Sequence, residues 1–208
     1  MTDPNYTALL LVIDRSGSMT TIRDDMLGGL TRLVEAQAAE PGRLTIDVVQ
    51  FDDQIEHTYH LCPPELVSLE LEPRGMTALW DAVGRGMADF GAELAALPED
   101  ERPGSVQVVI ITDGMENSSR EFTGEGLSTA IARQQADYSW NFTFLGANQD
   151  AIATARGMGI AAEHALTYAP VDGAVAAAND ALNMHVSAVR AGDASGYTEA
   201  QRSAAMRQ

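Results

Sequence analysis

The stretch that decides the fold is Thr7–Thr20, which reads TALLLVIDRSGSMT. Within it, Leu9–Ile13 is an unbroken apolar run that stops abruptly at Asp14. A run of this length predicts a strand buried on both faces, as in a parallel sheet covered by helices. Asp14, Ser16 and Ser18 then follow the carboxyl end of that strand, where open α/β sheets bind their ligands. Asp-x-Ser-x-Ser offers only hard oxygen donors, which favour magnesium, manganese or calcium over zinc.

A second apolar run, Val106–Thr112, also ends in an acid, at Asp113. If the two strands are neighbours where the winding of the sheet reverses, Asp14 and Asp113 face one crevice. Two carboxylates that close repel each other, and a divalent cation removes that repulsion. Thr77, in a loop marked by Pro and Gly, adds a neutral hydroxyl. Magnesium prefers about six oxygen ligands, so at least one position is left for water or an incoming group.

Segments with strand and helix patterns alternate over most of the chain. Apolar residues at steps of three and four predict helices after Thr20 and over 79–97, and the pair Gly28-Gly29 in the first implies a close neighbour. Leu44–Phe51 and Ile55–Leu61, joined by Asp52-Asp53, predict an antiparallel hairpin. The pattern predicts a doubly wound α/β sheet with one antiparallel edge strand and helices on both faces.

The composition excludes several classes of function. The 208 residues carry a net charge of −17, which argues against binding nucleic acid or anionic lipid by bulk attraction. All 13 basic residues are arginine, so no Schiff-base or P-loop lysine exists. Cys62 is the only cysteine, which favours a reducing compartment. The start of the chain lacks a basic signal region and no apolar stretch reaches the ~20 residues of a membrane span, so we expect a cytoplasmic protein without one.

Three segments together resemble the metal-ion-dependent adhesion site of von Willebrand factor type A domains: Asp14–Ser18, Gly75–Thr77 and Ile111–Gly114. In that family an Asp-x-Ser-x-Ser motif, a distant Thr and a distant Asp hold one divalent ion, and all five positions are matched here. The resemblance covers residues 6 to 170 and implies the strand order 3-2-1-4-5-6. It divides the chain into a type A domain over 1–190 and a polar tail over 191–208, where Thr198-Glu199-Ala200-Gln201 has capping-box spacing.

The resemblance also implies a set of site residues and a function. The implied ligands of Mg²⁺, or of Mn²⁺ or Ca²⁺, are Asp14, Ser16, Ser18, Thr77 and Asp113. Independently of the resemblance, five residues beside these ligands in the sequence are candidates to surround them: Arg15, Gly75, Gly114, Glu116 and Asn117. The family's metal typically binds an acidic side chain, Asp or Glu, of a protein partner and performs no chemistry. The chain looks similar to compact intracellular bacterial members, so an AAA+ ATPase or a stress-response assembly is the expected kind of partner.

Other interpretations of these residues stay open. A magnesium-dependent phosphohydrolase would use Asp14 as nucleophile, although such enzymes usually have an Asp where Ser16 stands, and a lysine. A scaffold subunit would hold a purely structural metal. Arg15 points to solvent or local acids, or else pairs with a partner's carboxylate. Glu116 and Asn117 are surface loop residues in the simpler interpretation.

His57 and His60 spell H-x-x-H in the second half of the predicted hairpin. Residues three apart on a regular strand face opposite sides of the sheet. We therefore expect these two histidines to be ordinary hairpin residues that do not chelate a metal together.

Overall fold

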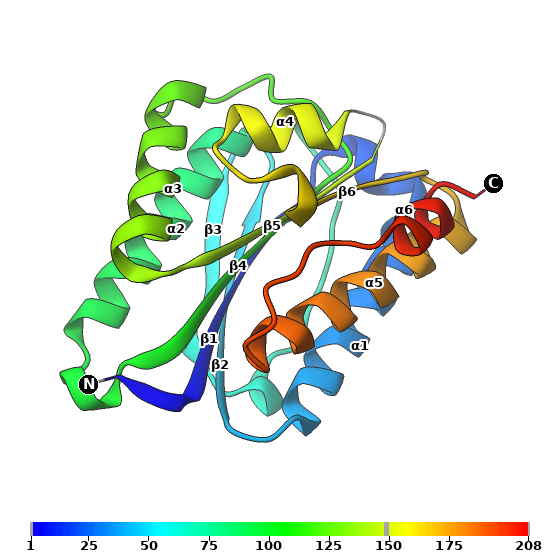
Figure 1. Ribbon diagram of the computed structural model, residues 1–208. Coiled ribbons are helices and arrows are strands. Elements are labelled where there is room, and N and C mark those ends of the chain that lie inside the picture. The colour runs from blue at the N-terminus through cyan, green and yellow to red at the C-terminus, as the bar shows by residue number, and fades with distance from the viewer. Residues whose placement is uncertain (1, 148–149, 208) are drawn as a thin grey trace.

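Strand β1 (Asp3–Asp14) lies inside a six-stranded sheet in the computed structural model, which describes residues 2–147 and 150–207. The strand order is β3-β2-β1-β4-β5-β6, and β3 alone among these strands pairs antiparallel (Figure 1). The other strands are β2 (Arg43–Phe51), β3 (Ile55–Cys62), β4 (Pro103–Thr112), β5 (Asn141–Ala147) and β6 (Ala165–Tyr168). This order and the β2–β3 hairpin confirm the predicted doubly wound sheet.

Helices cover both faces of the sheet, because successive residues of β1 feed two separate cores. Leu9, Leu11 and Ile13 pack into one core, and Leu10 and Val12 pack into the other. The first core is covered by α1 (Arg23–Ala39) and α5 (Asp172–Arg190). The second core is covered by α2 (Leu79–Ala96), α3 (Gly124–Tyr138) and α4 (Ala151–Gly157). Burial on both faces explains why β1 reads as a continuous apolar run.

Helices α1 and α5 approach each other closely at Gly29. A Cβ atom on Gly29 would lie 2.2 Å from Cγ of Asn179 on α5, a separation that side chains do not tolerate. Gly29 therefore has the packing reason expected from the sequence, which explains why a residue of low helix propensity stands there, whereas a Cβ on Gly28 would meet only the end of the Arg32 side chain, at 3.5 Å.

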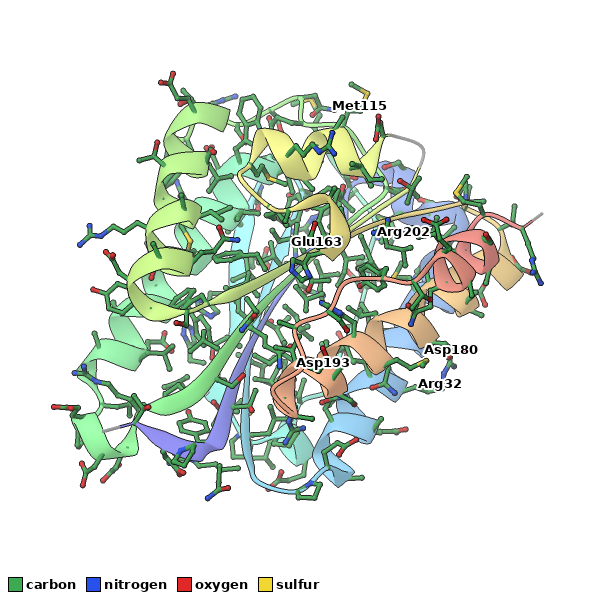
Figure 2. All side chains as sticks on the ribbon, viewed as in Figure 1. Arg32, Met115, Glu163, Asp180, Asp193 and Arg202 are labelled. Atoms are coloured by element: carbon green, nitrogen blue, oxygen red, sulfur yellow. The ribbon has the colours of Figure 1, made fainter. Side chains whose placement is uncertain are left out.

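The chain ends in a short helix, α6 (Glu199–Ala205), that packs beside α5 and β6. Thr198 and Gln201 form the capping box expected from their spacing. Arg202, labelled in Figure 2, donates hydrogen bonds to the carbonyls of Ala165 and Ala162. These bonds tie α6 to the start of β6. Among the described residues, no helix combines the length and the apolar character needed to cross a membrane.

Candidate metal site

Two strand ends bring the predicted acids together. Asp14 is the last residue of β1, and Asp113 directly follows the last residue of β4. The two strands are parallel neighbours, with Ile13 opposite Ile111. The hydroxyl of Thr112 donates a 2.5 Å hydrogen bond to Oδ2 of Asp14. The acids thus lie at the point where the winding of the sheet reverses, as the sequence predicts.

The two serines of the motif connect these acids. After Asp14 the chain turns into a short 3-10 helix, Gly17–Thr21. The backbone N–H of Ser16 donates to Oδ1 of Asp14 at 2.6 Å, and the Ser18 hydroxyl donates to Oδ1 of Asp113 at 2.6 Å. The two serine hydroxyl oxygens lie 3.0 Å apart. One continuous chain of polar contacts therefore runs from Asp14 to Asp113.

Thr77 reaches the same space from a third segment. It does not cap α2, since the N-cap residue of that helix is Ala78, which makes no side-chain cap bond. A Cβ atom built on Gly114 would lie 2.8 Å from the Thr77 hydroxyl, 3.4 Å from the Ser18 hydroxyl and 3.6 Å from Oδ2 of Asp14. Oxygen atoms from distant parts of the chain thus surround one small space. We call the three segments Asp14–Ser18, Gly75–Thr77 and Asp113–Gly114 the metal loops.

Glu116 and Asn117 hold the Thr77 segment in place. Asn117 accepts a 2.9 Å hydrogen bond from the Thr77 N–H through Oδ1, and its own N–H donates to the Thr77 carbonyl at 3.0 Å. Glu116 accepts the N–H of Trp80 at 2.9 Å, in the first turn of α2. Both residues connect the β4–α3 loop to the segment that presents the Thr77 hydroxyl, which the simpler surface-loop interpretation does not describe.

Gly75 closes the loop from the other side. Its φ angle of +66° is one that side-chain-bearing residues rarely adopt. A Cβ atom there would lie 2.2 Å from Oδ1 of Asp53, and the Gly75 carbonyl accepts the Gly17 N–H at 3.3 Å. A larger residue at this position would push the second metal loop away from the turn between β2 and β3.

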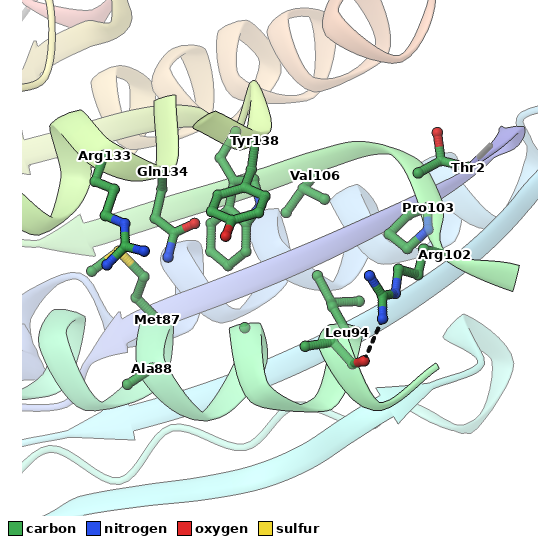
Figure 3. A pocket seen from close by; sticks show the side chains of 13 residues that line it. Thr2, Met87, Ala88, Leu94, Arg102, Pro103, Val106, Arg133, Gln134 and Tyr138 are labelled. Carbon is green, nitrogen blue, oxygen red and sulfur yellow. Dashed lines mark hydrogen bonds between the residues drawn. The ribbon is translucent and has the colours of Figure 1, made fainter. Parts of the chain in front are cut away.

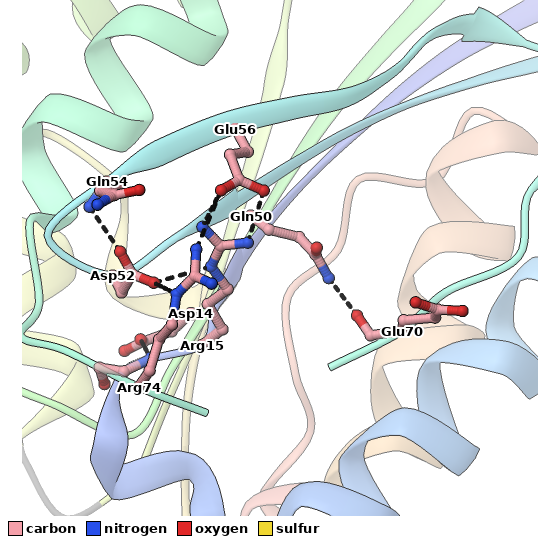
Figure 4. Close-up of polar contacts among 9 residues, drawn as sticks. Asp14, Arg15, Gln50, Asp52, Gln54, Glu56, Glu70 and Arg74 are labelled. Carbon is pink, nitrogen blue, oxygen red and sulfur yellow. Dashed lines mark hydrogen bonds and ion pairs between the residues drawn. The ribbon is translucent and has the colours of Figure 1, made fainter. Parts of the chain in front are cut away.

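Arg15 turns away from the metal loops and toward local acids (Figure 4). Its side chain is buried, and it donates to Asp52 at 3.0 Å and to Glu56 at 2.8 Å. Arg74 donates to the same Asp52 oxygen at 2.8 Å, and its N–H binds the Arg15 carbonyl. The hydrogen bond from Arg15 is the main cause that lowers the pKa of Glu56 to about 2. Burial acts to raise the pKa of Asp52, but its bonds to Arg74, Gln54 and Arg15 outweigh it, so the net pKa is lowered.

The negative charges of Asp14 and Asp113 are not fully compensated by the residues around them. Asp14 is fully buried, and burial is the main cause that raises its pKa to about 6. Burial also raises the pKa of Asp113, whose charge adds to the cost of ionising Asp14. Oδ2 of Asp113 is buried and has no hydrogen-bond partner in the described part of the chain. A divalent cation would satisfy that oxygen and stabilise both carboxylates in their charged form.

The donor atoms decide which kind of cation fits. The metal loops offer carboxylate and hydroxyl oxygens, and neither sulfur nor imidazole nitrogen is among the predicted ligands. Oxygen donors of this kind suit Mg²⁺, Mn²⁺ and Ca²⁺. The chemistry of the five predicted residues therefore fits one divalent cation.

Sequence reasoning misses two polar contributors to this region. Thr112 was not among the expected site residues, although a hydroxyl on the last residue of a neighbouring strand is a readable signal. Asp81, in the first turn of α2, accepts the backbone N–H groups of Arg120, Glu121 and Phe122. No sequence pattern marks this contact, because it joins segments about forty residues apart.

One expectation from the sequence is wrong. His57 and His60 do not face opposite sides of the sheet; their ring centroids lie 3.8 Å apart. The reason is a register shift in the β2–β3 pairing that inserts an extra residue between them and breaks the two-residue alternation.

A well-formed pocket lies away from the metal loops, between α2 and α3 beside the start of β4 (Figure 3). Its lining is mainly apolar and includes Met87, Leu94, Val106 and Trp140. None of the metal-loop residues lines it, so it belongs to the packing of the helices on this face.

Comparison with known proteins gives the fold a name. No protein-family model matches the sequence, and no curated protein sequence matches it. Among solved structures, proximal thread matrix protein 1 from the mussel byssus is 13% identical with a TM-score of 0.63, over 87% of this chain and 46% of that chain. The chain thus spans about half the length of that protein. The vWF domain of the type V pili tip protein Mfa5 from Porphyromonas gingivalis is 12% identical with a TM-score of 0.62, over 87% of this chain and 95% of that chain.

A further structure of the mussel protein is described as having a zinc occupied MIDAS motif; it is 16% identical with a TM-score of 0.56, over 89% of this chain and 45% of that chain. At these identities the likeness concerns the fold. This chain has the fold of von Willebrand factor type A domains. Its metal loops lie at the carboxyl ends of the central strands β1 and β4, where doubly wound sheets bind their ligands.

Proposed function

Starting from the von Willebrand factor type A fold, we propose that the chain is a metal-dependent protein-binding module. The metal is Mg²⁺, with Mn²⁺ or Ca²⁺ as substitutes, and its ligands are Asp14, Ser16, Ser18, Thr77 and Asp113. The open coordination position accepts an Asp or Glu side chain from a protein partner. The lone cysteine supports a reducing compartment, so we place the module in the cytoplasm, with an AAA+ ATPase or a stress-response assembly as partner.

The observation that carries this proposal is the buried, unpartnered oxygen of Asp113 beside the oxygens of Asp14, Ser18 and Thr77. Two carboxylates balance the charge of a divalent ion, and the hydroxyls add neutral donors. An incoming carboxylate then adds a strong ionic ligand without displacing either acid. Exposed apolar side chains stand nearby, with Met76 51% and Met115 69% exposed, so a partner has apolar surface to cover around the metal.

We propose further that the site catalyses no reaction. Phosphohydrolases with an aspartate nucleophile usually carry a second acid where Ser16 stands and a lysine that binds the phosphate, and this chain has neither. The alternative phosphohydrolase is tested with a generic phosphomonoester and Mg²⁺. Turnover that disappears in Asp14→Asn would replace this proposal with the enzyme.

The metal is tested by calorimetric titration of the metal-free chain with MgCl₂. We expect one binding event per chain in the wild type, none in Asp14→Asn, and much weaker but measurable binding in Thr77→Val. Asp89→Asn, which removes an exposed carboxylate on α2, is the matched control and should bind like the wild type. Circular dichroism establishes that each variant keeps the fold. Equal affinity in Asp14→Asn and wild type would refute the assigned ligands.

The partner role is tested with the immobilised chain in a native lysate. Proteins retained in Mg²⁺ should be released by EDTA and should not bind the Thr77→Val variant. A retained protein that is indifferent to both changes would favour the scaffold with a purely structural metal.

A further inference from the structure

Four side chains gather where the edge hairpin meets α2, away from the metal loops. Asp47 lies in the middle of β2, His57 and His60 lie on β3, and Glu93 lies on α2. Each of the four side chains offers one nitrogen or oxygen atom that could bind a metal, and these four atoms all lie within 4.8 Å of one another. We call these four residues the histidine group.

The irregular pairing of β2 with β3 creates this group. Val49 lies opposite His57, but Val48 lies opposite Tyr59, so Thr58 is an extra residue on β3. Such a bulge reverses the alternation of side chains beyond it. His60 therefore points to the same face as His57, toward α2. A second shift follows between Val48 and Ile46, near Leu61, whose φ of +39° is unusual for a residue with a side chain.

Two close contacts already join the group in pairs. Nε2 of His57 lies 3.0 Å from Oδ2 of Asp47, and Nδ1 of His60 lies 2.5 Å from Oε1 of Glu93. The other Asp47 oxygen accepts the N–H of Leu61 at 2.7 Å, which fixes the carboxylate. Asp47 is fully buried, while the side chains of His57 and His60 are 11% and 54% exposed. The group is therefore anchored at its base and open to solvent at its outer end.

We propose that the histidine group is a second metal site, which binds Zn²⁺ or a similar transition metal through two imidazole nitrogens and two carboxylate oxygens. Zinc binds these donors at about 2.0–2.2 Å in a tetrahedron, which places neighbouring ligand atoms about 3.3 Å apart. The contacts of 3.0 and 2.5 Å are close to that spacing, so small side-chain rotations are enough to receive the ion. Two neutral imidazoles and two carboxylates carry a charge of −2, which the ion neutralises.

Proton balance fits the same arrangement. An imidazole coordinates a metal through the lone pair of one ring nitrogen, so that nitrogen cannot keep a proton. In the metal-free chain a proton can lie between His57 and Asp47, or between His60 and Glu93. When the metal binds, this proton moves to the other ring nitrogen or is released to solvent. Nδ1 of His57 is buried and has no partner among the described residues, so the contact between Nε2 and Asp47 is the one that bears on the tautomer of this ring. Without a metal, the same residues form two separate imidazole–carboxylate pairs, and this is the alternative that the experiment has to separate.

The two sites are independent in position. Asp14 lies opposite Phe51 in the β1–β2 ladder, and Asp47 lies four residues earlier on β2. Four residues of strand span about 13 Å. An ion in the histidine group would join β3 to α2, which are connected by 16 intervening residues, and would thereby stabilise the edge of the sheet.

The test is a titration of the metal-free full chain with ZnCl₂ in the Asp14→Asn background, because oxygen sites also take zinc. We expect one Zn²⁺ per chain and an increase in melting temperature. Adding His60→Gln or Glu93→Gln should weaken binding by more than about tenfold and remove the temperature shift. Adding His164→Gln, which removes a histidine outside the group, should change neither.

Cobalt gives a second readout of the same geometry. The Co²⁺-loaded Asp14→Asn chain should show the intense visible absorption of a tetrahedral ion, and His60→Gln should abolish it. His60 is half-exposed, so this variant is expected to fold. Absence of zinc binding in Asp14→Asn, or binding that is equal with and without His60→Gln, would overturn the proposal and leave two ion pairs.

Discussion

The metal loops and the histidine group bring charged side chains together in two different ways. The metal loops collect oxygens at the carboxyl ends of β1 and β4, next to a short 3-10 turn. The histidine group collects nitrogen and oxygen halfway along the edge hairpin, against α2. The difference in donors predicts different metals on one sheet: hard divalent ions at the strand ends and a transition metal at the edge.

The two regions also differ in what holds their donors still. In the metal loops, backbone N–H groups from Ser16 and Thr77 and the hydroxyl of Thr112 fix the segments. In the histidine group, only Asp47 has a backbone donor, and the remaining order comes from pairs of side chains. Substitutions near the metal loops should therefore change magnesium affinity by moving the ligands. In the histidine group, zinc affinity should fall mainly when one of the four ligands itself is removed.

Asp113→Asn is expected to give the largest difference between the metal affinities of the two regions. The variant removes the carboxylate whose second oxygen is unpartnered, so Mg²⁺ affinity should fall beyond the roughly 10–100-fold typical of changes around a ligand. Zinc binding to the histidine group should persist. Calorimetry with each metal measures both, and Asp89→Asn is the control. A parallel loss of zinc binding would mean that the two regions are one coupled site.

A second way to sharpen the comparison is pH. The pKa of Asp14 is raised to about 6 in the fold, against 3.8 when unfolded, mainly by burial. Between these values the folded chain holds a proton that the unfolded chain has lost, so the stability contributed by Asp14 is present at low pH and is lost as pH rises through 6. Relative to Asp14→Asn, the metal-free wild type should lose on the order of 2–3 kcal/mol of unfolding free energy between pH 4 and 7.

Denaturant unfolding of both proteins in EDTA measures this difference. Saturating Mg²⁺ should reduce the decline in unfolding free energy between pH 4 and 6, because the ion holds the carboxylate in its charged form. A wild-type profile that runs parallel to that of Asp14→Asn in EDTA would show that burial of Asp14 costs nothing, and that the metal loops do not need a cation.

A smaller effect is expected from Gly114→Ala. The added Cβ would enter the space between the Thr77, Ser18 and Asp14 oxygens and should weaken Mg²⁺ binding about tenfold, as for other displacements around ligands. Gly173→Ala is the matched control, since a Cβ there meets nothing within 4 Å. Zinc titration of the same variant should be unchanged. Magnesium affinity equal to that of the control would place the ion elsewhere.

The sequence predicts the metal loops because their signals are local. An apolar run that stops at Asp14, and another that stops before Asp113, each reveal a strand and its carboxyl end within a few residues. The strand order then follows from the alternation of strands and helices and from the resemblance, and it brings the two ends together. The hydrogen bond from Thr112 to Asp14 needs only this adjacency.

The histidine group cannot be predicted in the same way, because it depends on a β-bulge that interrupts the regular alternation of side chains in β3. Two-residue alternation places His57 and His60 on opposite faces, and only the extra residue at Thr58 reverses this. A bulge depends on cross-strand pairing, which the one-dimensional pattern does not contain. Glu93 is still less readable, since it joins the group from a helix 33 residues beyond His60. The partner and the process served lie outside what either pattern encodes.

The smallest effect, and the sharpest test of positioning, is Asn117→Ala. Asn117 is exposed and holds Thr77 through its side-chain oxygen, so the variant should fold normally and weaken Mg²⁺ binding several-fold, to about tenfold at most. Asn141→Ala, another loss of an asparagine side chain, is the control. If Asn117 acts through the Thr77 hydroxyl, then Thr77→Val should cost less affinity in the Asn117→Ala background than in the wild type. The same loss in both backgrounds would show that Asn117 stabilises the loop without orienting the ligand, and would remove positioning as the feature that distinguishes the metal loops from the histidine group.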